Sequence, residues 1–145
     1  MASLTPEAQE IFGAKYDPAD ELWLRVFFTP SQRSQAAGRK YLERQRARNQ
    51  DRDALPNENV APAQLAALQK WGAPAKDPCA YLKNITQPTL VVNGSNDVIV
   101  YTVNSFILQQ NLPHAQLILY PDSNHGAQYQ YTELFLEHVT QFLKG

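Results

Sequence analysis

Two residues in the C-terminal third of the chain have side chains that together could carry out acid–base chemistry. Asp97 closes the polar segment 93–97, and His125 lies within a second polar segment, 122–126. A carboxylate that accepts a hydrogen bond from an imidazole fixes the ring tautomer and stabilises the imidazolium. The ring is then prepared to act as a general base and afterwards as a general acid. Asp97 and His125 are therefore a candidate acid–base pair, provided that the fold brings them together.

The sequence before each of these residues predicts a buried strand. Residues 89–93 and 116–120 are short apolar runs, and residues 103–112 between them have the length and pattern of a helix. A strand, a helical crossover and a second strand form a right-handed unit whose strands run parallel. Asp97 comes four residues after the first strand and His125 five residues after the second. Because neighbouring parallel strands lie about 4.8 Å apart and deliver their following loops to one edge, we expect the two side chains to meet.

Each residue also has an explanation that involves no catalysis. The residues before Asp97 are turn formers, so Asp97 alone is typical of a turn aspartate. His125 alone is typical of a surface loop, and Gly126 fits both interpretations because glycine allows close backbone approach. The placement of both loops at one edge favours the acid–base pair. His114 and His138 do not form the i, i+4 pairs of helix-borne zinc sites, so we expect no metal and take both as structural or exposed.

The N-terminal part of the chain, from Glu21 to about Trp71, has a helical pattern. Ser31 is a suitable N-cap for a helix that runs toward Arg48. Residues 62–71 predict a second helix that stops at Gly72. The segments between and after these helices are rich in Pro, Asn and Asp and are expected to be loops: 49–59 and 72–78.

The two helices of the C-terminal part are amphipathic. Because the strands are continuously apolar, they are expected to be buried on both faces, with helices on both sides of the sheet. The final helix spans residues 133–143. The apolar stripes are Val103, Phe106 and Ile107 on the crossover helix, and Phe135, Val139 and Phe142 on the final helix.

The composition is that of an ordinary globular chain, with 43% hydrophobic and 19% charged residues and a net charge of −1. No apolar run approaches the ~20 residues that cross a bilayer, and no secretory signal is visible, so we expect a cytoplasmic protein without membrane contact. The single cysteine, Cys79, fits a reducing compartment. Seven of the 13 basic residues lie between Arg33 and Arg52. A binding face for nucleic acid or an acidic partner is conceivable, but a solvated helix face is favoured, so no nucleic-acid partner is expected.

The segments that carry Asp97 and His125 resemble the last part of the α/β-hydrolase superfamily. Residues 88–100 look like the strand and acid loop of that family, where an apolar strand is followed by glycine, two residues and aspartate, as at Gly94 and Asp97. Residues 117–126 resemble its last strand and histidine loop, and the helix after them is similar to its closing helix. The resemblance covers about residues 86–145, and more loosely the helical segment, which lies where the family inserts its lid.

The resemblance implies an α/β fold class and a division of the chain into two regions. Residues 1–85 would be a helical lid (cap) region, and residues 86–145 the C-terminal part of the hydrolase core, a βαβ unit plus closing helix. Two parallel strands leave a sheet edge open, so we expect one incomplete domain that is unstable and inactive alone. The expected binding partners of such an incomplete domain are a complementing N-terminal half of the hydrolase or a second copy of this chain.

The family's serine elbow, Gly-x-Ser-x-Gly, is absent from this sequence. Ser95 lacks the second glycine of that elbow, and Cys79 lacks both, so neither is expected to be the nucleophile. In an intact relative the resemblance implies covalent catalysis on an ester-like or related small molecule. The nucleophile would attack, His125 would shuttle the proton, and Asp97 would orient His125. No cofactor is implied.

Three further questions stay open at this point. The chain could be a non-catalytic interaction module derived from a hydrolase, or a protein that binds polyanions through its basic helix. The substrate and the reaction subtype do not follow from the sequence. Four aromatic residues of the helical region either line an apolar substrate pocket or belong to the core, with the core favoured: Trp23, Phe27, Phe28 and Tyr41.

Overall fold

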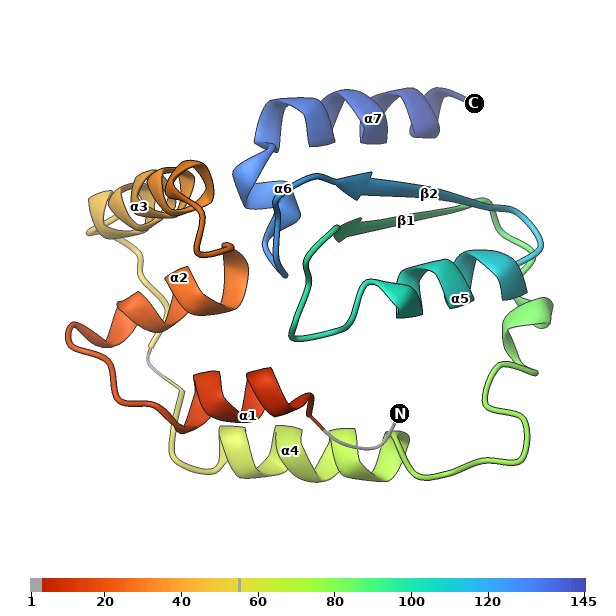
Figure 1. Ribbon diagram of the computed structural model, residues 1–145, viewed down its shortest axis with the longest axis horizontal. Coiled ribbons are helices and arrows are strands. Elements are labelled where there is room, and N and C mark those ends of the chain that lie inside the picture. The colour runs from red at the N-terminus through yellow and green to blue at the C-terminus, as the bar shows by residue number, and fades with distance from the viewer. Residues whose placement is uncertain (1–3, 55) are drawn as a thin grey trace.

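The computed structural model describes residues 4–54 and 56–145. Helices dominate the N-terminal half, and a small sheet with flanking helices forms the C-terminal half (Figure 1). The elements are α1 (Pro6–Gly13), η1 (Ala19–Glu21), α2 (Leu22–Phe27), α3 (Gln32–Ala47), α4 (Val60–Trp71), η2 (Leu82–Asn84), β1 (Thr89–Gly94), α5 (Val103–Asn111), β2 (Ala115–Tyr120), α6 (Ala127–Gln130) and α7 (Thr132–Lys144). The protein is of the α/β class, as the sequence predicts.

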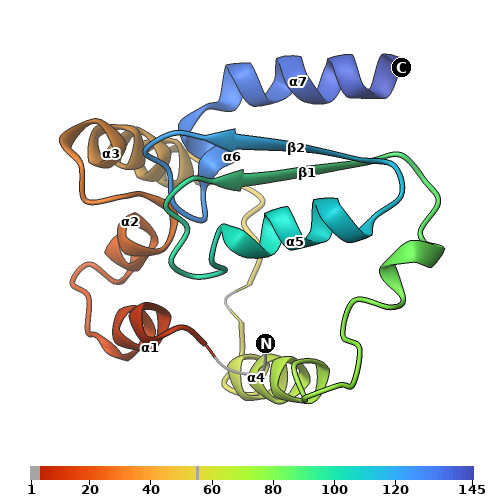
Figure 2. The ribbon, with the colours of Figure 1, turned by 45° about the vertical axis from the view of Figure 1, so that its right-hand side comes forward.

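Strands β1 and β2 pair in parallel, which confirms the prediction from the βαβ pattern. The register runs from Thr89 opposite Ala115 to Gly94 opposite Tyr120, so both strands end at the same level. Both arrowheads point toward α2, α3 and α6 (Figure 2). The loops that follow the two strands therefore emerge beside the helical N-terminal region.

Helices lie on both sides of the sheet, with α5 on one side and α7 on the other (Figure 1). Tyr120 at the end of β2 is 1% exposed, and its hydroxyl lies 2.8 Å from Nδ1 of His138 on α7. On the other side, Leu112, which follows α5, is buried in a cluster with Val91 of β1 and Leu82 of η2. Cys79 packs partly buried against this cluster, as a small filler would.

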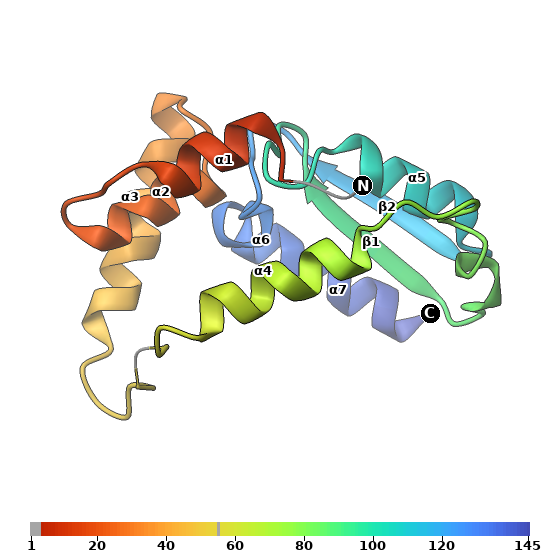
Figure 3. The ribbon, with the colours of Figure 1, turned by 90° about the horizontal axis from the view of Figure 1, so that it is seen from below.

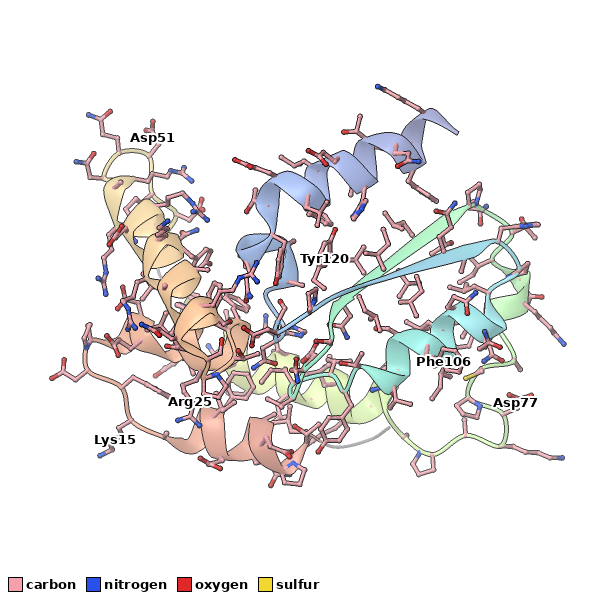
Figure 4. The ribbon with its side chains drawn as sticks, turned by 45° about the horizontal axis from the view of Figure 1, so that its top comes forward. Lys15, Arg25, Asp51, Asp77, Phe106 and Tyr120 are labelled. Carbon is pink, nitrogen blue, oxygen red and sulfur yellow. The ribbon has the colours of Figure 1, made fainter. Side chains whose placement is uncertain are left out.

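The crossover helix does not bury the stripe that its sequence pattern suggests. Val103, Phe106 and Ile107 are all exposed, with Phe106, marked on α5 in Figure 4, 54% exposed. The buried residues of α5 are Asn104 and Ser105, and the Ser105 hydroxyl accepts a hydrogen bond from Asn93 of β1 at 3.0 Å. The polar side of α5 thus faces the sheet, and its apolar stripe has no covering element among the described residues.

Helices α2 and α3 pack against each other around an apolar cluster of their own. Leu24 of α2 and Phe28, which directly follows α2, form this cluster with Tyr41 and Leu42 of α3. Gly38 allows the close approach, because a Cβ atom there would lie 2.7 Å from a side-chain carbon of Leu24. The cap of α3 agrees with the sequence prediction, since the Ser31 hydroxyl accepts from the backbone N–H of Ser34.

Helix α4 forms where the sequence predicts it and ends at Gly72, yet it buries none of its residues. Figure 3 shows it in front of the other elements, joined to them by long connections. Leu65, Leu68 and Trp71 are respectively 44%, 56% and 72% exposed. Among the described residues, no helix is long and apolar enough to cross a membrane.

Candidate active site

Asp97 and His125 meet at the carboxyl edge of the sheet, as the two-loop argument predicts. Nδ1 of His125 lies 2.9 Å from Oδ2 of Asp97, a hydrogen-bond distance. The Asp97 side chain is fully buried, whereas 38% of the His125 side chain is exposed. The carboxylate is thus withdrawn from water, and the imidazole stands between it and the surface.

The loop after β1 is built around the Asp97 carboxylate. Its second oxygen, Oδ1, accepts hydrogen bonds from the backbone N–H groups of Ile99 at 2.8 Å and Val100 at 2.9 Å. Thr102 closes the loop, because its hydroxyl donates to the Gly94 carbonyl at 2.6 Å and accepts from the Asp97 N–H at 3.3 Å. A buried carboxylate needs such partners, and here they leave Oδ2 directed at the imidazole.

The loop after β2 is held against both the acid loop and α2 by Asn124. Its side-chain oxygen accepts from the backbone N–H of Val98 at 2.9 Å, and its side-chain nitrogen donates to the Arg25 carbonyl at 3.2 Å. Asn124 is 4% exposed. Arg25, marked in Figure 4, lies on α2 far from His125 in sequence. Asn124 was not predicted as a site residue, and the available signal was an asparagine directly before the candidate histidine.

Two glycines permit the close approach of the segments that form the site. A Cβ atom on Gly94 would lie 2.1 Å from the Ser123 carbonyl oxygen, so only glycine fits between the two loops. A Cβ atom on Gly126 would lie 2.4 Å from Cβ of Phe27, and the Gly126 N–H donates to the Phe27 carbonyl at 3.0 Å. The His125 backbone is therefore fixed on both sides, by Asn124 and by Gly126.

Asp122, at the start of the same loop, binds the connection between α2 and α3. Its two carboxylate oxygens accept hydrogen bonds from the hydroxyls of Thr29 and Ser31, each at 2.6 Å. The pKa of Asp122 lies below its ordinary value. The hydrogen bond from Ser31 is the largest cause, followed by the hydrogen bond from Thr29, and the nearby positive charge of Arg33 also lowers it. Asp122 is therefore ionised at neutral pH.

The aromatic residues of the helical region extend from the buried cluster between α2 and α3 toward His125. The Phe27 ring stacks near the His125 ring, with centroids 6.4 Å apart and planes at 18°, and Trp23 stacks on Phe27 at 5.2 Å. Phe28 and Tyr41 are buried in the apolar cluster between α2 and α3. Of the four aromatics considered from the sequence, Phe27 therefore borders the imidazole, and Trp23 stacks on Phe27.

No family model matches the chain. An alpha/beta hydrolase fold protein from Chitinophaga pinensis superimposes with a TM-score of 0.82 and 37% identity over 92% of this chain. A 2-hydroxy-6-oxo-6-phenylhexa-2,4-dienoate hydrolase from Rhodococcus superimposes over 100% of the chain with a TM-score of 0.64 and 20% identity, which indicates the fold alone. The chain belongs to the α/β-hydrolase superfamily.

Two curated proteins are similar in sequence. The pimeloyl-[acyl-carrier protein] methyl ester esterase of Nitrosospira multiformis is 30% identical over 70 residues, which are 48% of this chain. The protein of the same name from Nitrosomonas europaea is 37% identical over 57 residues, which are 39% of this chain. The matches cover 27% and 23% of those esterases. The chain likewise covers only 47% of the Chitinophaga protein and 51% of the Rhodococcus one, about half of each α/β-hydrolase.

The other residues considered from the sequence lie apart from the Asp97–His125 pair. Ser95 is exposed, and its hydroxyl donates to the Asn96 side chain at 2.7 Å. His114 is exposed in the turn before β2, and His138 pairs with Tyr120 on the far side of the sheet. Within residues 4–54 and 56–145, no three His, Cys, Asp or Glu side chains gather as a metal site would require.

Proposed function

We propose that Asp97 and His125 are the acid and the general base of a nucleophile–His–Asp triad that cleaves an ester-like small substrate. The observation that carries the proposal is the 2.9 Å contact between Nδ1 of His125 and the buried Asp97 carboxylate. With Nδ1 directed at Asp97, the other ring nitrogen, Nε2, is the one left for proton transfer, and no described residue hydrogen-bonds it. This arrangement is what a general base needs before a nucleophile is placed beside it.

In the proposed reaction the nucleophile attacks the carbonyl carbon of the substrate and gives its proton to Nε2 of His125. Asp97 stabilises the imidazolium that forms, and His125 then donates the proton to the leaving oxygen. Water then attacks the covalent intermediate with His125 again acting as base; the bond to the nucleophile breaks, the acid product leaves, and His125 returns the proton to the nucleophile. The Phe27 ring lies beside the imidazole and carries the stacked Trp23 ring, and these two rings would contact the apolar part of a substrate.

The choice of an ester is supported by the two curated relatives, which carry the name of a methyl ester esterase. The carbonyl of an ester is also the simplest group that a carboxylate–imidazole pair and an oxygen or sulfur nucleophile can cleave without a cofactor. Because the chain spans only part of those relatives, the reaction is assigned here to the chain together with the polypeptide that completes it.

The nucleophile is proposed to come from polypeptide outside this sequence that packs on the exposed apolar surfaces of the C-terminal half. Strands β1 and β2 each pair on one edge only in the two-stranded sheet. The apolar stripe of α5 lies exposed beside them, including Val103 at 57%. Unpaired strand edges and apolar faces favour association with further strands and helices.

A chimera tests the proposal. The part of the Chitinophaga pinensis protein that this chain does not cover would be joined to this chain, and hydrolysis of p-nitrophenyl acetate measured. We expect saturable hydrolysis by the chimera and none by the chain alone. His125→Ala should lower kcat/KM by at least about 10³-fold, as expected for loss of a triad base. His114→Ala, which removes an exposed histidine from a turn, is the matched control and should leave the rate unchanged.

Two results would each overturn one part of the proposal, the external origin of the nucleophile or the role of His125. Saturable hydrolysis by the isolated chain, abolished by His125→Ala, would show that the nucleophile lies within these residues. A folded, active chimera that keeps its rate when His125 is replaced would show that the imidazole is not the base.

The absence of a serine elbow favours one second candidate, a non-catalytic interaction module with a hydrolase fold. Such a module would use the same exposed apolar surfaces to bind a protein partner. It predicts that the chimera folds but does not hydrolyse the ester, with or without His125.

A further inference from the structure

A closed circuit of side-chain hydrogen bonds joins the histidine loop to the start of α3. Ser31, the N-cap of α3, donates to Asp122, while its oxygen accepts from the Ser34 N–H at 3.1 Å. The Ser34 hydroxyl donates to the side-chain oxygen of Gln130 at 2.7 Å, and the Gln130 side-chain nitrogen donates to the Asp122 carbonyl at 2.8 Å. Asp122 therefore takes part through both its side chain and its backbone.

Thr29 belongs to the same network from its other side. Its hydroxyl donates to Asp122, and its backbone N–H donates to the Ser34 hydroxyl at 2.9 Å. Ser34 is 0% exposed and Thr29 6% exposed, whereas Ser31, Asp122 and Gln130 are partly exposed. Each hydroxyl has a donor role and an acceptor role filled, which leaves little freedom for the Asp122 carboxylate to shift.

The α2–α3 region thus holds the histidine loop at three successive places. Thr29 and Ser31 hold Asp122, the Arg25 carbonyl holds Asn124, and the Phe27 carbonyl holds Gly126. His125 lies within this span, three residues after Asp122. Asp122 adopts a left-handed backbone conformation with φ of 47°, which an aspartate tolerates only at some cost. This left-handed conformation thus occurs at the residue whose carboxylate accepts hydrogen bonds from both hydroxyls.

We propose that Asp122 is a positioning residue for His125, acting through Thr29 and Ser31 of the helical region. The inference rests on the proposed function, because positioning matters only if the imidazole acts as a base. It assigns to the helical region a role in the acid–base geometry: the connection between α2 and α3 sets how closely the His125 ring approaches Asp97.

The test measures the proton on Nδ1 of His125 by NMR in the full 145-residue chain. Asp122→Ala should accelerate exchange of this proton with water by at least about tenfold. Asp122→Asn should restore slow exchange in part, because its amide can still hydrogen-bond one hydroxyl. The matched control is Asp51→Ala, since Asp51 is an exposed aspartate with almost the same left-handed φ, 48°. This control should leave the His125 proton unchanged.

If Asp122→Ala does not fold, Thr29→Val gives the decisive comparison, because it removes one hydroxyl and keeps the shape of the side chain. Faster exchange in that variant would support the proposal. A folded Asp122→Ala or Thr29→Val chain with unchanged exchange would overturn it while leaving the Asp97–His125 pair intact. A wild-type chain without a protected Nδ1 proton would count against the proposed function itself, and against this inference with it.

Discussion

Gly94 lies directly against Ser123, so that a Cβ atom at position 94 would stand 2.1 Å from the Ser123 carbonyl oxygen. This contact sets the separation of the acid loop from the histidine loop. Gly94→Ala must push the loops apart, and we expect a loss of about 1–3 kcal/mol in the free energy of unfolding, typical of overpacking. Urea unfolding followed by circular dichroism measures it.

The control for this substitution is Gly13→Ala at the end of α1, where a Cβ atom meets nothing within 4 Å. Alanine there should be neutral or should stabilise by up to about 1 kcal/mol, because it restricts the unfolded chain. Equal effects at the two glycines would show that the loops do not pack as described.

The core between α2 and α3 depends on Phe28, which is 1% exposed. Phe28→Ala should cost about 3–5 kcal/mol, because it removes a large buried side chain and leaves a cavity. The same substitution at Phe12, which is 47% exposed, should cost less than about 1 kcal/mol. Urea unfolding of both variants gives the comparison, and similar losses would contradict the packing of this cluster.

The stability of the chain should depend on the ionisation of Asp122. Hydrogen bonds from Ser31 and Thr29 lower its pKa in the folded state, whereas an unfolded aspartate titrates near about 3.9. Because the pKa is lower in the folded state, the ionised carboxylate stabilises the fold above about pH 4. This contribution to the free energy of unfolding is lost as the pH falls through the folded pKa. The side chains of Glu7, Glu10 and Arg25 line the same cavity as Asp122.

Comparison with Asp122→Asn isolates this contribution. The difference in the free energy of unfolding between wild type and Asp122→Asn should be largest near pH 7 and should shrink toward about pH 3. A difference that stays constant over this range would show that the Asp122 carboxylate is not held by the two hydroxyls.

Local patterns in the sequence were sufficient to predict the strands and the crossover helix that bring the acid–base pair together. The apolar runs of β1 and β2 and the crossover between them fixed parallel pairing, and this pairing explains why Asp97 and His125 meet. The N-cap at Ser31 and the end of α4 at Gly72 were also predictable, because each depends on neighbours within a few residues.

Contacts between distant segments were not predictable in the same way. Asn124 and Asp122 bind Arg25, Thr29 and Ser31 across 91 to 99 residues of sequence, and no local pattern specifies such partners. The exposure of the apolar stripe of α5 was also not predicted. Such a stripe shows that one face of the helix should be covered, but it does not show which polypeptide covers that face.

The Nδ1 proton of His125 tests the central claim most directly. The NMR spectrum of the chain, recorded with ¹⁵N-labelled histidine, should contain a strongly downfield Nδ1 proton that is assigned by its absence in His125→Ala. Asp97→Asn should move this resonance upfield and speed its exchange with water, while Asp77→Asn in the exposed loop before η2 should leave it in place. A resonance that is the same in wild type and Asp97→Asn would contradict the contact between the carboxylate and the imidazole on which the proposed function depends.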